Sequence, residues 1–143
     1  PEIQVIEHQA HAPGHAALLI KERGVLVLGD MLSDVLVPML DFGGAADPIE
    51  DYLTALELLE AVVNDVDVAV PGNGTIATAD EIQKRFNLDR AYVTALRDGK
   101  NLSDPRIGSL AKPGWEWVSS IHEGQQQSVA QRKEGQATPD SRD

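Results

Sequence analysis

The sequence has no cysteine among its 143 residues, which excludes disulfide bonds, thiol nucleophiles and cysteine-ligated metal sites. Positive charge is also scarce, with 12 lysine and arginine residues against 23 aspartate and glutamate residues and a formal net charge of −11. Such an acidic chain repels phosphate backbones and anionic lipid surfaces, so we expect neither nucleic acid nor a membrane as a partner. Any zinc site would have to use histidine and carboxylate ligands.

Long hydrophobic runs are lacking as well. No apolar stretch approaches the roughly 18–20 residues that a transmembrane helix requires, and no basic segment followed by an apolar one marks a signal peptide. A cytoplasmic location is therefore the default expectation, unless a signal precedes the first residue. That residue is Pro1 rather than methionine, which is compatible with a processed chain, an expressed segment or a fragment. Its length and its hydrophobic fraction of 42% suit one domain with a modest core.

Short apolar runs predict the strands. Residues 3–6 form one β-prone stretch, and two further runs at 17–20 and 25–28 flank a polar turn ending in Gly24. Two such runs around a short turn are typical of a β-hairpin. Neither run alternates between apolar and polar residues, so we expect both strands to be covered on both faces. A fourth strand is expected at 66–70.

Two helices follow from helical periodicity and capping signals. Asp47 as N-cap with Pro48 at the first position opens a helix whose apolar residues recur with helical spacing up to Val63. Thr78 and Glu81 form a capping box for a second helix, which extends to about residue 98 with a possible break near residue 87. Strands, helix, strand and helix in this order predict an α/β layer architecture with one helical layer.

The last part of the chain is expected to add little to the domain. Trp115 and Trp117 are interpreted as packing residues of a short final helix. From Glu123 the sequence is polar and rich in glutamine, which is typical of a disordered tail. We therefore expect a domain over residues 1–122 and a tail over residues 123–143.

The predicted hairpin brings two potential metal ligands together. His15 directly precedes its first strand and Asp30 directly follows its second. Because adjacent strands lie about 4.8 Å apart, a histidine nitrogen and a carboxylate oxygen at these ends can reach one ion at about 2.0–2.2 Å. The end of the strand at 66–70 is the natural third contributor, but its loop offers Asn73, which is a poor zinc ligand.

Three motifs in order resemble the C-terminal half of the metallo-β-lactamase-fold hydrolases. They are His11-Ala-Pro-Gly-His15, then Gly29-Asp30, then Pro71-Gly-Asn-Gly74. That family typically shows Pro-Gly-His-Thr, a Gly-Asp after a hairpin, an amphipathic helix and then Pro-Gly-His-Gly. The order and approximate spacing match over residues 1–98.

The resemblance implies an αβ/βα sandwich, of which this chain would form roughly one half, and one or two bound metal ions, usually zinc. Carried over by motif, His15 matches a first-site metal ligand and Asp30 matches the aspartate that bridges two ions. Asn73 stands where the family usually has a second-site histidine, so it marks a degenerate metal position. The family's main ligand motif, His-x-His-x-Asp-His, does not occur in this sequence.

The resemblance further implies the C-terminal portion of a zinc-dependent hydrolase that attacks a small-molecule substrate with a metal-bound hydroxide. The bond would be an ester, thioester, lactone, lactam or phosphodiester. No catalytic residue is assigned within this chain, and we expect the isolated chain to be inactive. The alternative is a non-catalytic binding or scaffold protein of the same fold. The partner that covers its apolar sheet would be a missing N-terminal half or a second copy of the chain.

Each site residue also has a plainer interpretation, and His15 could simply be a polar residue in a turn. Asp30 could cap a helix beginning at Met31, and Asn73 with its following glycine is an ordinary turn pair, the reading we favour over metal binding. His8 and His11 are expected to be solvated loop residues, because their spacing gives a cluster with His15 no fixed geometry.

Overall fold

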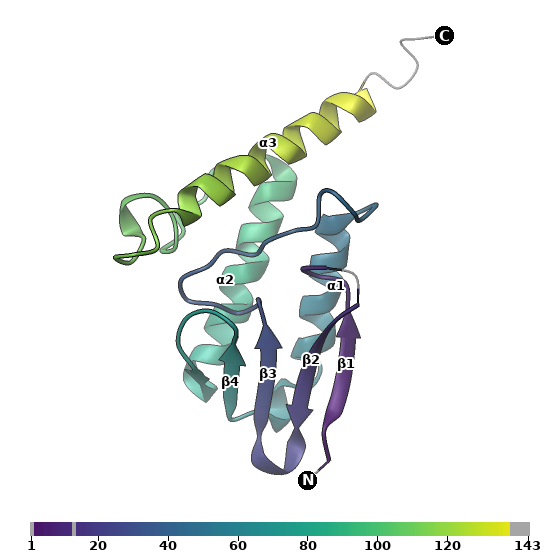
Figure 1. Ribbon diagram of the computed structural model, residues 1–143, viewed down its shortest axis with the longest axis vertical. Helices are drawn as coiled ribbons and strands as arrows, with labels where there is room; N and C mark the ends of the chain where they lie inside the picture. Colours follow the sequence, from purple (N-terminus) through teal and green to yellow (C-terminus); the bar gives the residue numbers. More distant parts are fainter. Residues whose placement is uncertain (1, 13, 138–143) are drawn as a thin grey trace.

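Five strands form one mixed sheet in the computed structural model, which describes residues 2–12 and 14–137 (Figure 1). The strands are β1 (Gln4–His8), β2 (His15–Ile20), β3 (Val25–Gly29), β4 (Val68–Pro71) and β5 (Ala77–Thr78). They lie side by side in sequence order. The pair β3 and β4 is parallel, and the other three pairs are antiparallel. The predicted strands and the hairpin of β2 and β3 are confirmed.

Three α-helices accompany the sheet in the described part of the chain: α1 (Pro48–Glu60), α2 (Ala79–Asp98) and α3 (Val118–Ala137). The α1 start is the predicted one, with Pro48 in the first turn and the Asp47 side chain accepting a hydrogen bond from the Glu50 amide at 3.1 Å. α2 runs without a break. The predicted capping box is wrong, because the Thr78 side chain makes no capping hydrogen bond. Thr78 is instead paired with Val68 in the sheet.

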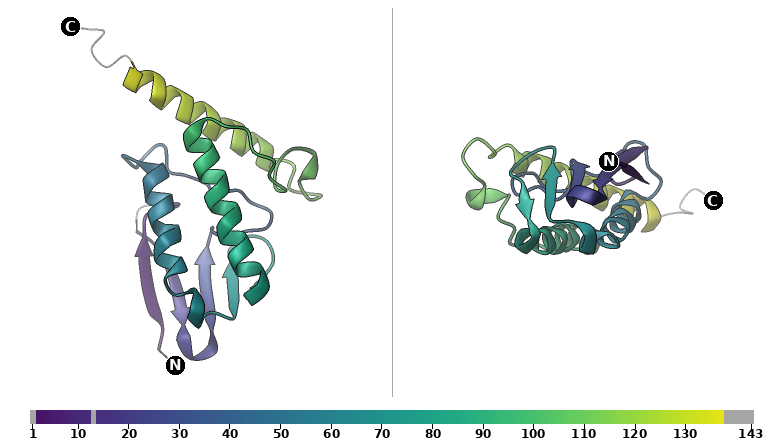
Figure 2. Two further views of the ribbon diagram at one scale, coloured as in Figure 1. Left: turned by 180° about the vertical axis from the view of Figure 1, so that it is seen from behind. Right: turned by 90° about the horizontal axis from the view of Figure 1, so that it is seen from below.

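The helices α1 and α2 both pack on the same face of the sheet, which gives the predicted single helical layer (Figure 2). Alternate strand residues such as Leu19, Leu26 and Leu28 point into this layer and are almost completely buried. They meet Leu56 of α1 and Phe86 of α2 in one core. The chain thus has a mixed α/β architecture, a sheet with helices on one face, that corresponds to part of an αβ/βα sandwich.

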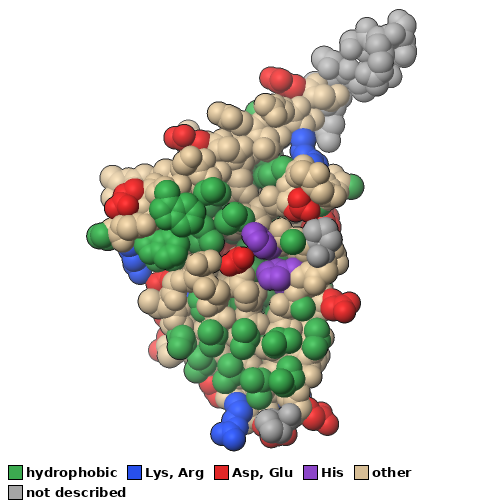
Figure 3. Space-filling view, in the orientation of Figure 1, with side chains coloured by type: hydrophobic (Ala, Val, Ile, Leu, Met, Phe, Trp, Pro, Cys, Tyr) green, Lys and Arg blue, Asp and Glu red, His purple; other side chains and the backbone are tan. Residues whose placement is uncertain are grey.

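The opposite face of the sheet carries apolar side chains that no described element covers (Figure 3). Strand pairing places Val5, Leu18, Val27 and Val70 in one row across four strands. The last three are half-buried, and Val5 is 56% exposed. The expectation that the hairpin strands are covered on both faces is therefore wrong for the described residues.

The prediction of a disordered tail from Glu123 is also wrong as far as Ala137. α3 is continuous through this region and lies across the end of α2 (Figures 1 and 2). Its Gln125 and Val129 are buried, which attaches the helix to the body. The rest of the predicted tail, residues 138–143, lies outside the described residues.

The segment between β3 and α1 contains no helix. Residues 31–47 form a long loop with a buried apolar part that includes Leu32, Leu36 and Val37. Asp30 therefore caps no helix, and that alternative for it is wrong. No helix in the described ranges is both long enough and apolar enough to cross a membrane.

Candidate metal centre at one edge of the sheet

The predicted ligands meet where several strands end at the same edge. β3 ends at Gly29 and its parallel neighbour β4 ends at Pro71, and these two residues are in register. The antiparallel neighbour β2 begins there with His15, which is paired with His8 at the end of β1. Histidine side chains gather beside a carboxylate at this edge (Figure 3). The hairpin thus brings His15 and Asp30 to the same end of the sheet, close enough for the Asp30 charge to act on His15.

Two glycines make this close approach possible. A Cβ atom on Gly29 would lie 2.5 Å from Nε2 of His15, and the residue has a φ of +69°. A Cβ atom on Gly72 would lie 3.2 Å from Oδ1 of Asp30 and equally close to the Gly29 carbonyl oxygen. Side chains at these positions would therefore push the histidine ring and the carboxylate away from the edge.

Both carboxylate oxygens of Asp30 already have partners within the chain. The Asn73 amide nitrogen donates to Oδ1 at 2.9 Å, and Nε2 of His11 lies 3.3 Å from Oδ2. Asn73 thus contacts Asp30 through its amide nitrogen, which is a hydrogen-bond donor. His11 Nδ1 lies 3.2 Å from the Met39 carbonyl oxygen.

The three N-terminal histidines form a cluster that we did not predict. The His15 ring centroid lies 4.7 Å from that of His8 and 5.6 Å from that of His11. His8 is 4% exposed, and the His11 side chain is 28% exposed and in contact with Asp30. The expectation that His8 and His11 are solvated loop residues is wrong. The missing signal was the pairing of β1 with β2, which places His8 opposite His15.

Burial keeps two of these imidazoles neutral near pH 7. It lowers the pKa of His8 to about 4, with repulsion from His15 as the smaller cause. Burial also lowers the pKa of His15, and His11 adds to this effect while Asp30 opposes it. His8 Nε2 and His15 Nδ1 are buried without a hydrogen-bond partner. Neutral imidazole is the form that binds a metal ion.

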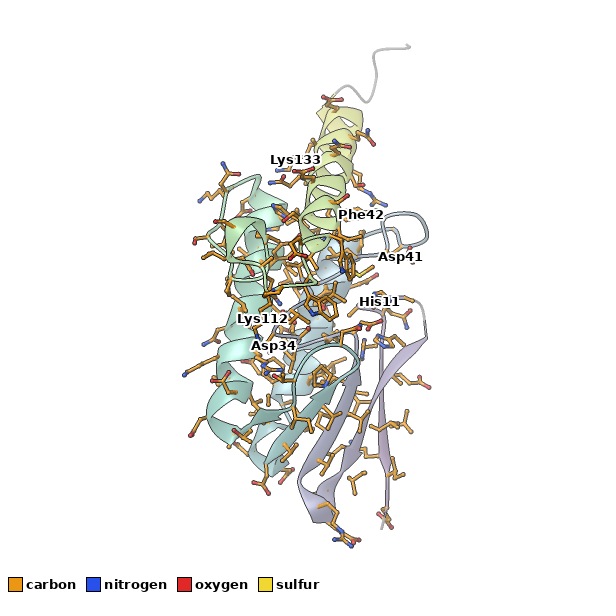
Figure 4. The ribbon with its side chains drawn as sticks, turned by 60° about the vertical axis from the view of Figure 1, so that its left-hand side comes forward. His11, Asp34, Asp41, Phe42, Lys112 and Lys133 are labelled. Carbon is orange, nitrogen blue, oxygen red and sulfur yellow. The ribbon has the colours of Figure 1, made fainter. Side chains whose placement is uncertain are left out.

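A second polar cluster links the loop after β3 to the loop after β4 by hydrogen bonds. Asp34 accepts hydrogen bonds from the Thr75 amide at 2.9 Å, the Thr75 hydroxyl at 2.7 Å and Lys112 at 2.9 Å. Asp34 and Lys112 lie at the same end of the sheet as His11 (Figure 4). Burial opposes the charged form of Asp34. This effect is outweighed by the hydrogen bonds from Thr75 and Lys112 and by the charge of the nearby Arg85. Together they hold the pKa of Asp34 well below its usual range. The sequence analysis missed this cluster.

The described residues fit part of a metal centre but do not complete one. His15 and Asp30 offer two donors, whereas a catalytic zinc ion in proteins usually has three protein ligands. In the described ranges, no group of three or more histidine, cysteine, aspartate or glutamate side chains is placed to hold a metal ion. The metal roles of His15 and Asp30 and the degenerate role of Asn73 therefore stay predictions.

The fold and this edge define the class of protein as one half of a layered α/β protein with polar side chains gathered at its strand ends. The family model for the metallo-beta-lactamase superfamily matches residues 1–73. This range contains the first two motifs and most of the third, and it amounts to half of the chain. The chain therefore belongs to the metallo-beta-lactamase superfamily. No curated protein sequence matches it.

A solved structure supports the same fold. The chain is similar to a metallo-beta-lactamase family protein from Thermus thermophilus, with a TM-score of 0.51 and 24% sequence identity. The alignment covers 93% of this chain but 44% of that protein. The chain therefore spans less than half the length of this structural neighbour, which agrees with a partial sandwich.

Proposed function

We propose that the chain is the C-terminal part of a metal-dependent hydrolase, with zinc as the metal, and that it contributes His15 and Asp30 to the metal centre. The remaining ligands would come from an N-terminal half of the same fold. A bound zinc ion supplies a water molecule that is acidic enough to act as a hydroxide nucleophile near neutral pH. The substrate would be a small molecule with an ester, thioester, lactone, lactam or phosphodiester bond.

The observation that carries this proposal is the neutral His15 imidazole, which packs against the backbone of Gly29 and lies close enough to Asp30 to be influenced by its charge. Neutral imidazole and carboxylate together are a donor pair that zinc prefers. Asp30 also accepts a hydrogen bond from Asn73 and contacts His11, and such partners orient a carboxylate ligand from outside the coordination sphere.

The test is the zinc content and hydrolytic activity of the full-length protein. We expect His15→Ala and Asp30→Asn each to weaken zinc binding by at least about tenfold and to abolish turnover of a panel of the five substrate types. His122→Ala is the matched control, because His122 lies in α3, where it is hydrogen-bonded to Tyr92, and not at this edge. Unchanged zinc content in both site variants would contradict the proposal. So would robust zinc-dependent turnover by the 143-residue chain alone.

A second candidate is a non-catalytic binding or scaffold protein of the same fold. It is favoured by the contacts of Asp30, whose two oxygens already face Asn73 and His11. In this case the full-length protein would purify without zinc, and added zinc would leave its thermal unfolding temperature unchanged. A ligand that binds the native state raises that temperature, so a zinc-dependent increase would favour the hydrolase instead.

The open apolar face of the sheet supports a covering partner in either case. We propose that the N-terminal half of the same fold covers it, with a second copy of this chain as the alternative. Light scattering separates the two arrangements: a monomeric 143-residue chain with a stable fold would contradict the homodimer.

A further inference from the structure

The backbone just after Asp30 has a conformation that its residue does not favour. Leu32 has a φ of +57°, which makes it the one non-glycine residue with positive φ in the described ranges. Leucine rarely adopts this left-handed conformation, so the surrounding structure has to hold it. Leu32 is also 1% exposed, and its side chain is anchored in the core.

Polar groups hold the Leu32 backbone from both sides. Its amide donates to Oδ2 of Asp89 at 2.9 Å, and its carbonyl oxygen accepts from Nη1 of Arg85 at 3.1 Å. Both side chains come from α2 and are almost completely buried. A buried carboxylate that accepts a backbone hydrogen bond fixes the position of that amide closely.

Asp89 is itself fixed by a buried arginine. Nη1 of Arg106 lies 2.6 Å from Oδ1 of Asp89 and also donates to the carbonyl oxygens of Ser33 and Leu36, at 3.2 and 3.4 Å. The other side of the Arg106 guanidinium is paired with Asp104. These bonds fall on the loop that leaves β3, a few residues after Asp30.

We propose that Asp89 is a positioning residue for the Asp30 carboxylate and acts through the Leu32 peptide group. The short segment between β3 and this peptide gives Asp30 little freedom once Gly29 is fixed in the sheet and Leu32 is fixed by Asp89. A loss of the Asp89 bond releases the strained peptide, and Asp30 then moves away from Asn73 and His15. The polar side chains of this network lie beyond residues 1–73, which match the family model.

The plainer interpretation is that the network only attaches α2 to the loop after β3. Asp104 offers a matched control that separates this interpretation from the proposal. Asp104 is as buried as Asp89 and binds the same arginine, but no hydrogen bond joins its side chain to residues 31–36. Asp89→Asn and Asp104→Asn both remove a buried charge beside Arg106. A merely structural role predicts the same effect for both variants.

The experiment follows the side-chain amide signals of Asn73 by ¹H–¹⁵N NMR in the metal-free full-length protein, because this amide donates to Asp30. We expect the signals to move in Asp89→Asn and to stay in place in Asp104→Asn, with similar losses of thermal stability. Asp89→Glu is the second variant: it keeps the charge beside Arg106 for folding, but its longer side chain displaces the oxygen from Leu32. Signals that stay in place in the folded Asp89 variants, or that move equally in Asp104→Asn, would overturn the proposal.

Cobalt binding adds a readout that rests on the proposed function. Asp89→Asn should weaken Co²⁺ binding by about 10- to 100-fold, as loss of an outer partner does at metal sites, and should change the visible absorption of the bound ion. Asp104→Asn should do neither. If the wild-type protein binds no Co²⁺, the metal-dependent function fails, and the Asn73 signals alone decide whether Asp89 positions Asp30.

Discussion

Gly29 has no side chain, and this leaves room for the His15 ring at the predicted site. Gly29→Ala places a Cβ atom 2.5 Å from His15 Nε2 at a φ of +69°. We expect a loss of about 1–2 kcal/mol in unfolding free energy and a loss of at least about tenfold in metal affinity, because the histidine ring has to move. Urea unfolding and zinc titration of the full-length protein measure the two effects.

Gly43→Ala is the control for this prediction. No atom lies within 4 Å of a Cβ atom built at Gly43, and no positive φ is recorded for it. It should leave zinc affinity unchanged. Equal zinc affinity in the two alanine variants would show that Gly29 is not needed for the approach of His15.

At the scale of single residues, the sequence predicted only some of the side chains that meet at the candidate metal centre. His15 and Asp30 came from the hairpin, because a hairpin returns the chain to its start. His8 and His11 were misjudged because their contacts depend on the partner of β1 and on the loop at Met39. Neither is encoded in local spacing. The pairing of His8 with His15 does follow if residues 4–8 are assumed to be antiparallel to 15–19.

At the scale of elements, the contact of Asp34 with the loops after β4 and before α3 predicts a dependence of stability on pH. The folded pKa of Asp34 lies below its usual value of 3.8. Its contribution is therefore fully present above about pH 4 and is lost as the pH falls below that value. We expect a contribution of about 1–2 kcal/mol. Asp34→Asn should lose this amount near neutral pH and should flatten the acid branch of the stability curve.

Urea unfolding of the wild type and of Asp34→Asn, near neutral pH and at about pH 3, measures this difference. Asp67→Asn is the control, since Asp67 is an exposed aspartate in the turn before β4. It should leave the acid branch as in the wild type. An acid branch of equal slope in Asp34→Asn would contradict the role assigned to Asp34.

Gln125 makes three of the hydrogen bonds that attach α3 to the body. Its amide donates to the Pro38 carbonyl oxygen at 2.8 Å and to the Tyr92 hydroxyl at 3.0 Å, and its oxygen accepts from the Leu40 amide at 2.8 Å. Gln125→Ala leaves these buried groups unpaired, so we expect a loss of about 2–3 kcal/mol. Gln127→Ala, on the exposed side of the same helix, should change stability by less than about 0.5 kcal/mol. Thermal unfolding compares them, and equal stability of the two variants would contradict the role assigned to Gln125.

The same residues explain why α3 was predicted as a tail. Its buried face follows a helical spacing through Val118, Ile121, Gln125 and Val129. A glutamine occupies one of these positions, and the residues around them are polar, so local composition resembled disorder. The helix is specified by hydrogen bonds to residues 38–40 and Tyr92, which only the tertiary structure brings within reach.

At the scale of the whole molecule, the sequence predicted a sheet with one layer of helices. For example, capping at Asp47 and the helical period that follows it identified α1 correctly. The covering of the sheet could not be judged from apolar strands alone. A strand that is apolar on both faces signals a second layer, but that layer need not belong to the same stretch of chain.

The open face of the sheet carries the row of Val5, Leu18, Val27 and Val70. A charged substitution in this row tests whether a second half of the fold covers the face. Val27 lies on β3 near the middle of the open face, between Leu18 and Val70. In the full-length protein, Val27→Lys places a charge under the proposed N-terminal half, and we expect a loss of about 3–5 kcal/mol. In the isolated 143-residue chain, the same substitution should reduce self-association, because it interrupts an exposed apolar patch. Thermal unfolding and light scattering give the two readouts.

Leu58→Lys is the control on the other side of the molecule, because Leu58 is 45% exposed on the outer side of α1. It should change the stability of either form by no more than about 0.5 kcal/mol. If the full-length protein tolerates Val27→Lys as well as Leu58→Lys, the open face remains in solvent when the chain is complete. The proposed N-terminal half of the sandwich would then have to pack elsewhere. The opposite result, destabilisation only in the full-length protein, would identify this face as the junction between the two halves that together complete the site at His15 and Asp30.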